Sequence, residues 1–399
     1  MLHAGVGYSV AVNPRTAAVE ATSAALKQAG LRIADGALCF ASSAHAAMYQ
    51  SLVRTVADTA GTREVAGCGS IGVIAAGREI ETGPSVAVLV FGGGAIDATR
   101  LFAPSLRGRA REVAAELAAA ARPKLGTNNL LCVFPDTYNL EPEPFLATLA
   151  QELPGVTVVG GGATEDGSAG ETFQFCGDAV SSNSVSGMLL AGNFDLNLGA
   201  TLACAPLKQA HRVTAVRDNI IFGLDGRPAY EVFAEAAGPL AADLKRAVTF
   251  VFLGVPVEAD AQRIERGNFY VRNIMGASEE HGAIAVAYRP KVGDLVGFVL
   301  RDAERSREEL KATLAEMGTR THNPPAFGLY FDCVSRGSGL YNIPDHDSAY
   351  ISQSFGGLPV AGFFTGFEIG LLARATGLLQ YSGVLALISE KTPCLPSNR

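Results

Sequence analysis

FGLYFDCVSRG, residues 327–337, and PVAGFFTGFEIG, residues 359–370, are the two stretches that decide the fold of this chain. Each begins with a short apolar run rich in aromatic and β-branched residues and ends in glycine and polar residues, which is typical of a buried strand followed by a turn. Residues 346–355, between them, have the spacing of a helix. The alternation of strand, helix and strand indicates an α/β fold.

The same order of elements occurs three times along the chain. Each copy opens with an amphipathic helix and continues with an apolar strand, a second helix, another strand, a glycine-rich turn and a final strand. We therefore predict an α/β fold of three related, superposable strand–helix–strand–glycine turn–strand repeats. The elements are expected at residues 16–29, 37–41, 44–60, 64–68 and 85–91; at 105–122, 130–134, 144–153, 156–159 and 184–191; and at 304–317, 327–331, 346–355, 359–362 and 383–389.

An added mixed α/β segment, residues 199–301, precedes the third copy. It contains alternating apolar runs that indicate strands, and one helix is expected at residues 228–235. Residues 211–225 are polar and rich in turn-forming residues, so we place a boundary near residue 220. The predicted domains are residues 1–220, with two repeats, and 221–399, with the added strands and the third repeat.

Composition argues against several classes of protein. The net charge of −7 opposes nucleic-acid binding, which depends on neutralising phosphates. No stretch reaches the roughly 18 uncharged apolar residues of a membrane helix, and no secretory signal precedes residue 14, so we expect a cytoplasmic protein that does not contact a membrane. The seven cysteines form no C-x-x-C pair, which favours reduced thiols over a disulfide framework.

Glycine-rich turns follow a strand in each copy: GCGSIG at residues 67–72, GGGATED at 160–166 and GFFTGFEIG at 362–370. Such turns let backbone amides approach a ligand, although they also serve tight turns and close strand packing alone. None has the pattern of a phosphate or dinucleotide loop, so no cofactor is expected. We expect positive φ at Gly162, Gly366 and Gly370. The candidate ligand-binding residues of these turns are Cys68, Ser70, Gly161, Gly162, Asp166, Gly362 and Gly366.

The third copy carries the most chemistry. Cys333 and Arg336 follow its first strand, and Thr365 and Glu368 follow its second. Strands that end at one sheet edge would bring these four residues to a common cleft, where Arg336 could hold a carboxylate and Glu368 an amine. The sequence thus predicts a site for a zwitterion. The alternative is an ion pair between Arg336 and Glu368 that ties two loops together.

The chain resembles the FIST family over nearly its whole length. The N-terminal part is similar to a FIST N domain in VAGCGS at residues 65–70, REI at 78–80 and VGGGA at 159–163 with Asp166 downstream. The C-terminal part is similar to a FIST C domain in FYVRNI at 269–274, Cys333 with Arg336-Gly337, the turn at 362–370 and YSGVLAL at 381–387. Phe367 replaces the small residue of the family turn, and Leu379-Gln380 replaces a His-Asn pair. The resemblance implies a sensory domain for small ligands, amino acids among them.

Three functions remain open at this point. The first is a ligand-binding sensor, because no complete catalytic motif occurs. The second is a thiol enzyme in which Arg336 lowers the pKa of a nucleophilic Cys333, with His322, His346 or His45 as the base. The third is an interaction platform for a signalling partner, which would require another chain or a homo-oligomer. No metal site is expected.

Overall fold

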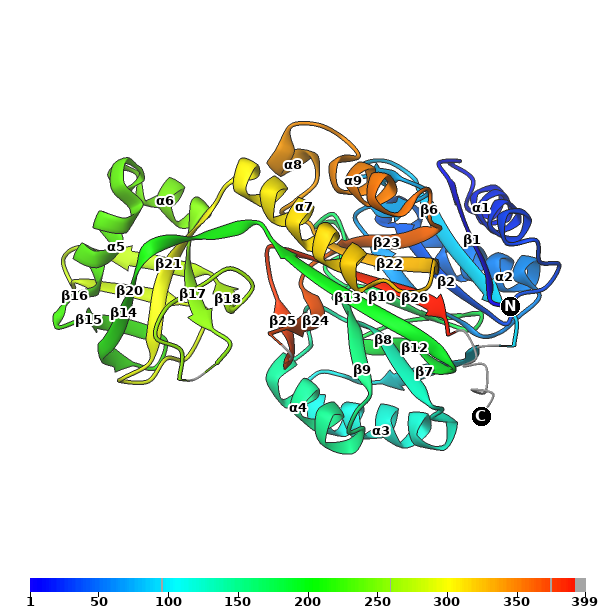
Figure 1. The fold of residues 1–399 in the computed structure, drawn as a ribbon, viewed down its shortest axis with the longest axis horizontal. Helices are drawn as coiled ribbons and strands as arrows, with labels where there is room; N and C mark the ends of the chain where they lie inside the picture. Colours follow the sequence, from blue (N-terminus) through cyan, green and yellow to red (C-terminus); the bar gives the residue numbers. More distant parts are fainter. Residues whose placement is uncertain (95, 259, 374, 392–399) are drawn as a thin grey trace, which may run out of the picture.

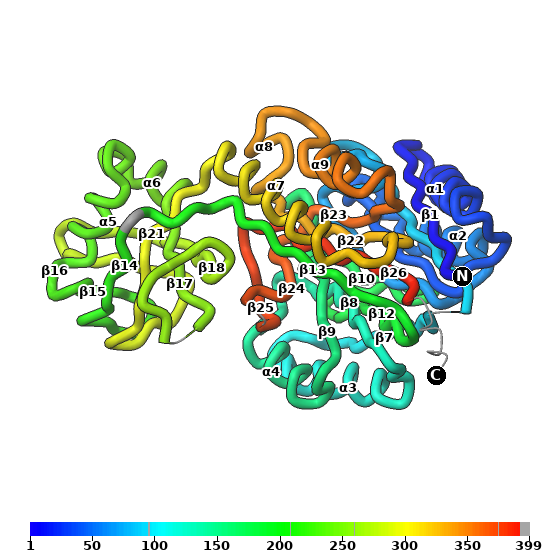
Figure 2. Tube along the Cα trace, in the orientation of Figure 1, coloured from blue at the N-terminus to red at the C-terminus, as the bar shows by residue number. Residues whose placement is uncertain are grey.

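The structure, a computed structural model, describes residues 1–94, 96–258, 260–373 and 375–391. The chain forms a larger body and a smaller lobe, which is the green and yellow part at the left of Figure 1. The lobe consists of strands and helices between residues 204 and 301, and the chain passes between lobe and body at its two ends (Figure 2). These ends are paired, Cys204 opposite Arg301, so two adjacent antiparallel strands join the lobe to the body.

The first sheet of the body is built on two parallel strands, β2 (Gly36–Ser42) and β3 (Val65–Ser70). β6 (Val86–Gly92) pairs antiparallel with β2, and β1 (His3–Ser9) pairs antiparallel with β6. Every residue of β2 and β6 is buried, as their uninterrupted apolar composition indicates.

Two further sheets have the same pairing order. In each, a parallel pair is joined by an antiparallel third strand, which pairs in turn with an antiparallel fourth strand. This order is what a threefold repeat requires of the sheets, while superposition of the three units stays a prediction. The strands are β8 (Asn128–Pro135), β9 (Thr157–Gly161), β12 (Ser184–Gly192) and β7 (Ile96–Pro104) in the second sheet, and β22 (Pro325–Cys333), β23 (Val360–Thr365), β26 (Ser382–Glu390) and β13 (Phe194–Leu202) in the third.

Each sheet is completed by a β-hairpin from a different part of the chain. The hairpin that follows β3 joins the third sheet, the one that follows β9 joins the first, and the one that follows β23 joins the second. This cyclic exchange locks the three sheets together. The hairpins are β4 (Val73–Ala75) with β5 (Arg78–Ile80), β10 (Phe173–Cys176) with β11 (Ala179–Ser182), and β24 (Glu368–Leu372) with β25 (Ala375–Leu379).

Pairs of helices cover the outer faces of the sheets (Figure 1). The first helix shows why such segments form: Asn13 accepts hydrogen bonds from the backbone of Arg15 and Thr16, and Gly30 ends the helix with φ 67°. The helices are α1 (Pro14–Ala29) and α2 (Tyr49–Ala60) on the first sheet, α3 (Ala110–Ala121) and α4 (Pro142–Glu152) on the second, and α7 (Ala303–Arg320) and α9 (His346–Phe355) on the third, with the short α8 (Ser338–Tyr341) before α9.

The inner faces of the three sheets meet in one apolar core. Phe40, Phe134 and Phe331 come from β2, β8 and β22, and Phe363 from β23. The ring centroids of Phe40 and Phe134 are 5.3 Å apart, and those of Phe134 and Phe331 are 6.0 Å apart. Aromatic contacts at such distances add to the stabilisation that burial gives.

The lobe is a curled antiparallel sheet in which the long strand β14 has different partners along its length. β14 pairs with β21 in its first part and with β15 in its second. The described part of the lobe contains two α-helices, where one helix was expected, because residues 244–250 are helical before the strand at residue 251 begins. The elements are β14 (Cys204–Arg217), β15 (Ile220–Leu224), β16 (Arg227–Pro228), α5 (Ala229–Ala237), α6 (Leu244–Phe250), β17 (Val251–Pro256), β18 (Phe269–Arg272), β19 (Ile274–Ser278), β20 (Ala283–Val286) and β21 (Leu295–Arg301).

Positive φ at Gly162, Gly366 and Gly370 was a wrong prediction, since none of the three has it. Close packing explains these glycines instead. A Cβ at Gly162 would lie 2.2 Å from Thr137 Oγ1, and one at Gly370 would lie 2.8 Å from a methyl carbon of Val384. Alanine at these positions is therefore disfavoured by overlap with neighbours, not by backbone strain.

Replacing Phe134 by alanine tests the central core. We expect a loss of about 3–5 kcal/mol in the free energy of unfolding, because a large fully buried ring leaves a cavity that three sheets cannot close. Phe102→Ala is the matched control, since Phe102 is 39% exposed on β7, and it should cost about 0.5 kcal/mol. Urea unfolding measures both, and equal losses would contradict the central role of Phe134.

Candidate ligand-binding site

The side chain of Arg336 is fully buried and is held inside the protein. Its Nε lies 2.8 Å from Asp332 Oδ1, its Nη2 lies 2.6 Å from Asp347 Oδ2, and its Nη1 donates to Ser306 Oγ at 3.1 Å. Tyr330 Oη also donates to Asp347. The guanidinium that the sequence assigned to a ligand's carboxylate is thus paired with two carboxylates of the chain.

The two aspartates that contact Arg336 have pKa values shifted in opposite directions. Burial acts to raise the pKa of Asp347, but Arg336 and the hydrogen bond from His346 override it and hold the pKa below its usual range. Burial raises the pKa of Asp332, and the nearby charge of Asp347 raises it further. Asp347 therefore carries the negative charge that most directly balances Arg336, while the pKa of Asp332 lies above its usual range.

Glu368 is fully buried and contacts two hydroxyl groups. Its carboxyl lies against Thr365 Oγ1 and accepts hydrogen bonds from Ser382. Thr365 Oγ1 also donates to the carbonyl of Asp332 at 3.0 Å. Burial raises the pKa of Glu368 to about 8, although the hydrogen bonds from Ser382 and Thr365 act to lower it. A hydroxyl has one proton, so a protonated Glu368 completes this network where a carboxylate would not.

Cys333 is buried beside Glu368, and burial raises the pKa of its thiol to about 12. Arg336 does not lower it, because that guanidinium is turned toward Asp332 and Asp347. The bases considered for it have other environments: His346 contacts Asp347 and Arg307, and His322 is exposed. The third, His45, is buried. The high pKa of Cys333 favours the protonated thiol, and among the described residues no histidine or arginine contacts it.

The three glycine-rich turns do meet. Ser70 Oγ lies within hydrogen-bond distance of the carbonyl oxygens of Gly72 and Phe364, at 2.6 and 2.9 Å, and 3.2 Å from Thr164 Oγ1. The backbones of the second and third turns are joined by hydrogen bonds from Gly162 to Phe367 and from Gly366 to Gly162. The turns thus fill the space between one another.

The remaining turn residues have different surroundings. Cys68 is buried in the central core, and Gly362 faces the carbonyl oxygen of Tyr330, 1.6 Å from where its Cβ would lie. A Cβ at Gly161 would lie 2.4 Å from the side chain of Thr365. Asp166 is exposed and accepts hydrogen bonds from Ser168.

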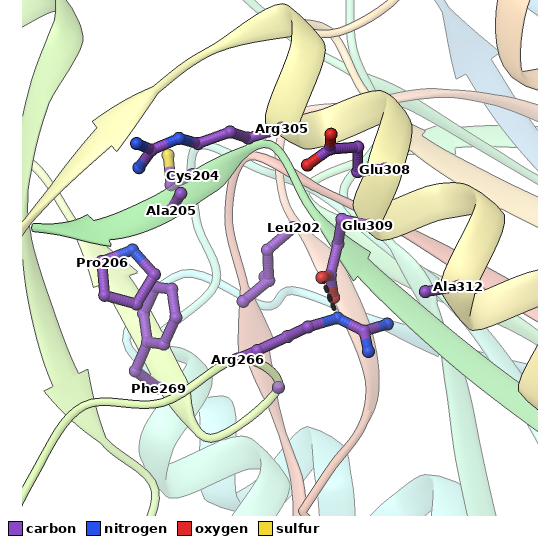
Figure 3. Close-up of a pocket in the computed structure, with 11 residues that line it drawn as sticks. Leu202, Cys204, Ala205, Pro206, Arg266, Phe269, Arg305, Glu308, Glu309 and Ala312 are labelled. Carbon is purple, nitrogen blue, oxygen red and sulfur yellow. Dashed lines mark hydrogen bonds and ion pairs between the residues drawn. The ribbon is translucent and has the colours of Figure 1, made fainter.

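A cavity of about 340 Å³ lies at the junction of body and lobe (Figure 3). One wall is α7 of the body, which contributes Arg305, Glu308, Glu309 and Ala312, and the other walls come from both parts. Arg266 of the lobe forms ion pairs with Glu309 and, at 3.1 Å, with Glu316. The other residues that line the cavity are Leu202, Cys204, Ala205, Pro206, Gly267 and Phe269.

Two charged side chains of this cavity have no partner. Among the residues that the structure describes, the side chains of Arg305 and Glu308 make no hydrogen bond or ion pair with any other. They are three residues apart on α7, so they lie on neighbouring turns of one helix face. Figure 3 shows Arg305 extending toward Cys204, away from the joined pair Arg266 and Glu309. The cavity therefore offers one cation and one anion to a molecule that enters it.

α7 connects the cavity to the buried charges. Ser306 lies next to Arg305 in the sequence, is buried, accepts from Arg336 and contacts Tyr341 Oη at 2.7 Å. One side of the helix thus lines the cavity while the other contacts the network of Arg336 and Asp347. Movement of the first turns of α7 would change both.

Comparison with known proteins gives the family. A FIST N domain matches residues 35–227, and a FIST C domain matches residues 229–371. The chain belongs to the FIST family. FIST domains are generally taken to be sensory domains for small ligands.

Full-length relatives of this FIST protein occur in mycobacteria. The uncharacterized protein Rv0628c of Mycobacterium tuberculosis is 28% identical over 97% of this chain and 99% of its own length. The uncharacterized protein Mb0898c of Mycobacterium bovis is 27% identical over 97% of this chain and 98% of its own. A solved structure, cyanuric acid hydrolase from A. caulinodans, matches 98% of this chain and 100% of its own with 12% sequence identity. Its TM-score of 0.36 is too low to bear on fold or function. No helix among the described residues has the length and apolar content to cross a membrane.

Sequence reasoning missed the cavity residues. In the sequence, Arg305, Glu308 and Glu309 belong to a charged stretch that looks like an ordinary solvated helix face. Arg266 lies in a polar loop more than 35 residues earlier. Their proximity depends on how the lobe packs on the body, for which no local pattern exists.

The raised pKa of Glu368 predicts a pH dependence of stability. The native state keeps a proton that the unfolded chain, with a pKa near 4.5, releases, so this contribution is present below pH 4.5 and is lost as pH rises through about 8. Glu368→Gln keeps a neutral side chain of the same shape. Between pH 4.5 and about 8, we expect the free energy of unfolding of Glu368→Gln to rise relative to that of the wild type. The rise should total a few kcal/mol, on the order of 1.4 kcal/mol per pKa unit.

Urea unfolding at a series of pH values measures this difference. Glu112→Gln, at an exposed site on α3, is the control and should follow the wild type. A constant difference between Glu368→Gln and the wild type from pH 5 to pH 9 would show that Glu368 is ionised throughout.

Proposed function

We propose that this FIST protein is a cytoplasmic sensor that binds a small zwitterion of the amino-acid class in the cavity between lobe and body. The observation that carries the proposal is the unpaired Arg305 and Glu308 on one face of α7. Arg305 would hold the ligand's carboxylate and Glu308 its ammonium group. Binding without turnover fits the protonated state of the Cys333 thiol.

The walls of the cavity suit an apolar side chain. Leu202, Pro206 and Phe269 line it together with small residues, and its volume of about 340 Å³ is in the range of small-molecule sites. An amino acid with an apolar side chain would bury that side chain here while its charged groups face α7. The ligand class therefore follows from the combination of two charges and an apolar wall.

The ion pairs of Arg266 supply a means of signalling. They join the lobe to α7 across the cavity, and only two paired strands otherwise carry the chain between lobe and body. A ligand that competes for Glu309 or displaces α7 would change the position of the lobe. We propose that a partner chain, or a second copy in a homo-oligomer, detects this change. Size-exclusion chromatography with and without ligand tests the second possibility.

Arg305→Ala tests the ligand site. In a thermal-shift screen against the protein amino acids, the wild type should gain stability with increasing ligand concentration. The variant should lose at least about tenfold in affinity, because a hydrogen bond to a charged group contributes about 1.5–3 kcal/mol.

Arg111→Ala is the matched control for this experiment. Arg111 is an exposed arginine on α3, outside the residues that line the cavity, so its removal should leave the ligand response unchanged. A response that survives in Arg305→Ala would place the site elsewhere. Cys333→Ser should keep full affinity, whereas loss of a ligand-dependent reaction in that variant would instead support the thiol enzyme.

A further inference from the structure

β13 is the outermost strand of the third sheet, so only one of its two edges is paired, with β26. Just beyond β13, the N–H of Ala203 donates to the carbonyl of Tyr381, the residue before β26. In an antiparallel pair, the N–H and C=O of one residue point to the same side, and that side alternates along the strand. The backbone groups of Leu198, Ala200 and Leu202 therefore point away from β26.

Two contacts agree with this direction. The carbonyl of Leu198 accepts a hydrogen bond from Arg320 of α7 at 3.0 Å, as a carbonyl at the unpaired edge can. Pro206, in the strand that continues β13, has no N–H to offer a neighbour, which suits an unpaired edge. Among the residues that the structure describes, the N–H groups of Leu198, Ala200 and Leu202 have no hydrogen-bond acceptor at this edge. Such an edge is a template for another strand.

Two cavities follow this edge. One, of about 370 Å³, is lined by three consecutive residues of β13, 198–200. Side chains of consecutive strand residues point to opposite faces, so a cavity that touches all three lies at the strand edge. The cavity of about 340 Å³ is lined by Leu202 and by residues 204–206 of the continuing strand (Figure 3). Both cavities are also lined by Arg266 and Glu309, so they adjoin and form one groove, the β13 groove.

The β13 groove has the chemistry that an extended peptide requires. Backbone donors and acceptors that are unpaired at alternate residues match those of a second extended chain. From Leu198 to Leu202 the edge is roughly 13 Å long, at about 3.3 Å per residue, which is the length of about four residues. Arg305, whose side chain extends toward Cys204 in Figure 3, has no partner among the described residues and can bind a terminal carboxylate.

The ion pairs of Arg266 with Glu309 and Glu316 lie where the two cavities meet. A peptide that reaches both cavities must pass them. The side chain of Arg266 is 47% exposed, and an ion pair with that exposure adds little stability. Backbone hydrogen bonds to the edge of β13 can therefore compensate for its loss. A single amino acid in the first cavity need not disturb these ion pairs, so the length of the ligand decides whether Arg266 is released from α7.

We propose that the β13 groove binds a short peptide of about four residues, which pairs with the unpaired edge of β13 in an extended conformation. The peptide runs parallel to β13, and its terminal carboxylate lies at Arg305. This inference rests on the function proposed for the cavity of Arg305 and extends the ligand from one amino acid to an oligopeptide. Glu308 then accepts from the amide N–H of the last peptide residue, in place of an ammonium group.

Titration calorimetry with the tetrapeptide alanyl-alanyl-alanyl-leucine and with free leucine tests this proposal. The wild type should bind the tetrapeptide more tightly than leucine. Three analogues, each methylated at one amide nitrogen, test the pairing, because successive amides of an extended chain point to opposite sides. Methylation of an amide that faces β13 should weaken binding at least about tenfold, and methylation of its neighbour should have little effect.

A proline in β13 tests the same hydrogen bonds from the side of the protein. Ala200→Pro removes one N–H of the unpaired edge and leaves the hydrogen bonds to β26 in place. It should weaken tetrapeptide binding about tenfold and leave leucine binding unchanged, since Ala200 does not line the cavity of Arg305. Ala200→Ser keeps the N–H and is the matched control. Urea unfolding shows whether the proline variant is folded; if it is not, the methylated peptides still decide.

The outcomes separate this inference from the proposed function. Leucine binding without tetrapeptide binding would overturn the inference and leave the proposed function standing. Absence of binding by leucine and by the tetrapeptide would count against both. Equal affinity of all three methylated analogues, or full tetrapeptide affinity in a folded Ala200→Pro variant, would show that the peptide does not pair with β13 and would overturn the inference. Alternating losses would support it, whether or not leucine binds.

Discussion

The contact of three parallel strand pairs at one centre is the constraint on which the rest of the body depends. Phe40, Phe134 and Phe331 fill that centre. The partner strand has glycine at the corresponding place in each sheet: a Cβ on Gly67, Gly160 or Gly362 would lie 1.8, 1.9 or 1.6 Å from the carbonyl oxygen of the adjacent strand. These glycines let the two parallel strands of each pair lie close together, while the rings of Phe40, Phe134 and Phe331 pack between the sheets.

The elements of this arrangement could be predicted from the sequence, but their partners could not. Apolar runs mark β2, β8 and β22, and helical spacing marks α9 at the residues expected. The first strands β1, β7 and β13 and the three hairpins were missed. In β7 and β13 the buried residues are interrupted by exposed or half-buried ones, so neither strand forms a continuous apolar run. The strands of the hairpins are too short for a periodic signal. Which sheet a hairpin joins depends on contacts between distant residues that a local pattern does not record.

For the candidate site, too, some features could be predicted from the sequence and others could not. Cys333, Arg336, Thr365 and Glu368 were expected to share one cleft; in the structure Thr365 contacts Glu368, while Arg336 is paired with Asp332 and Asp347. Burial was not predictable, because a sequence does not show that Asp347 lies close enough to neutralise Arg336. The charges left for a ligand, Arg305 and Glu308, lie instead where the lobe packs on the body. Functional groups at such a junction depend on tertiary placement, so they look ordinary in the sequence.

The exchange of hairpins also affects how the protein is made. β26, at residues 382–390, lies between β13 and β22, so the third sheet is incomplete until these residues have left the ribosome. β4 cannot pair until β23, nearly 290 residues later, has been synthesised. β10 pairs with β3, which precedes it in the chain. Pairing between such distant segments makes folding slow and leaves unpaired strand edges exposed in a growing chain. A shortened product, ending before residue 382, would lack a central strand and would be a ready substrate for chaperones and proteases.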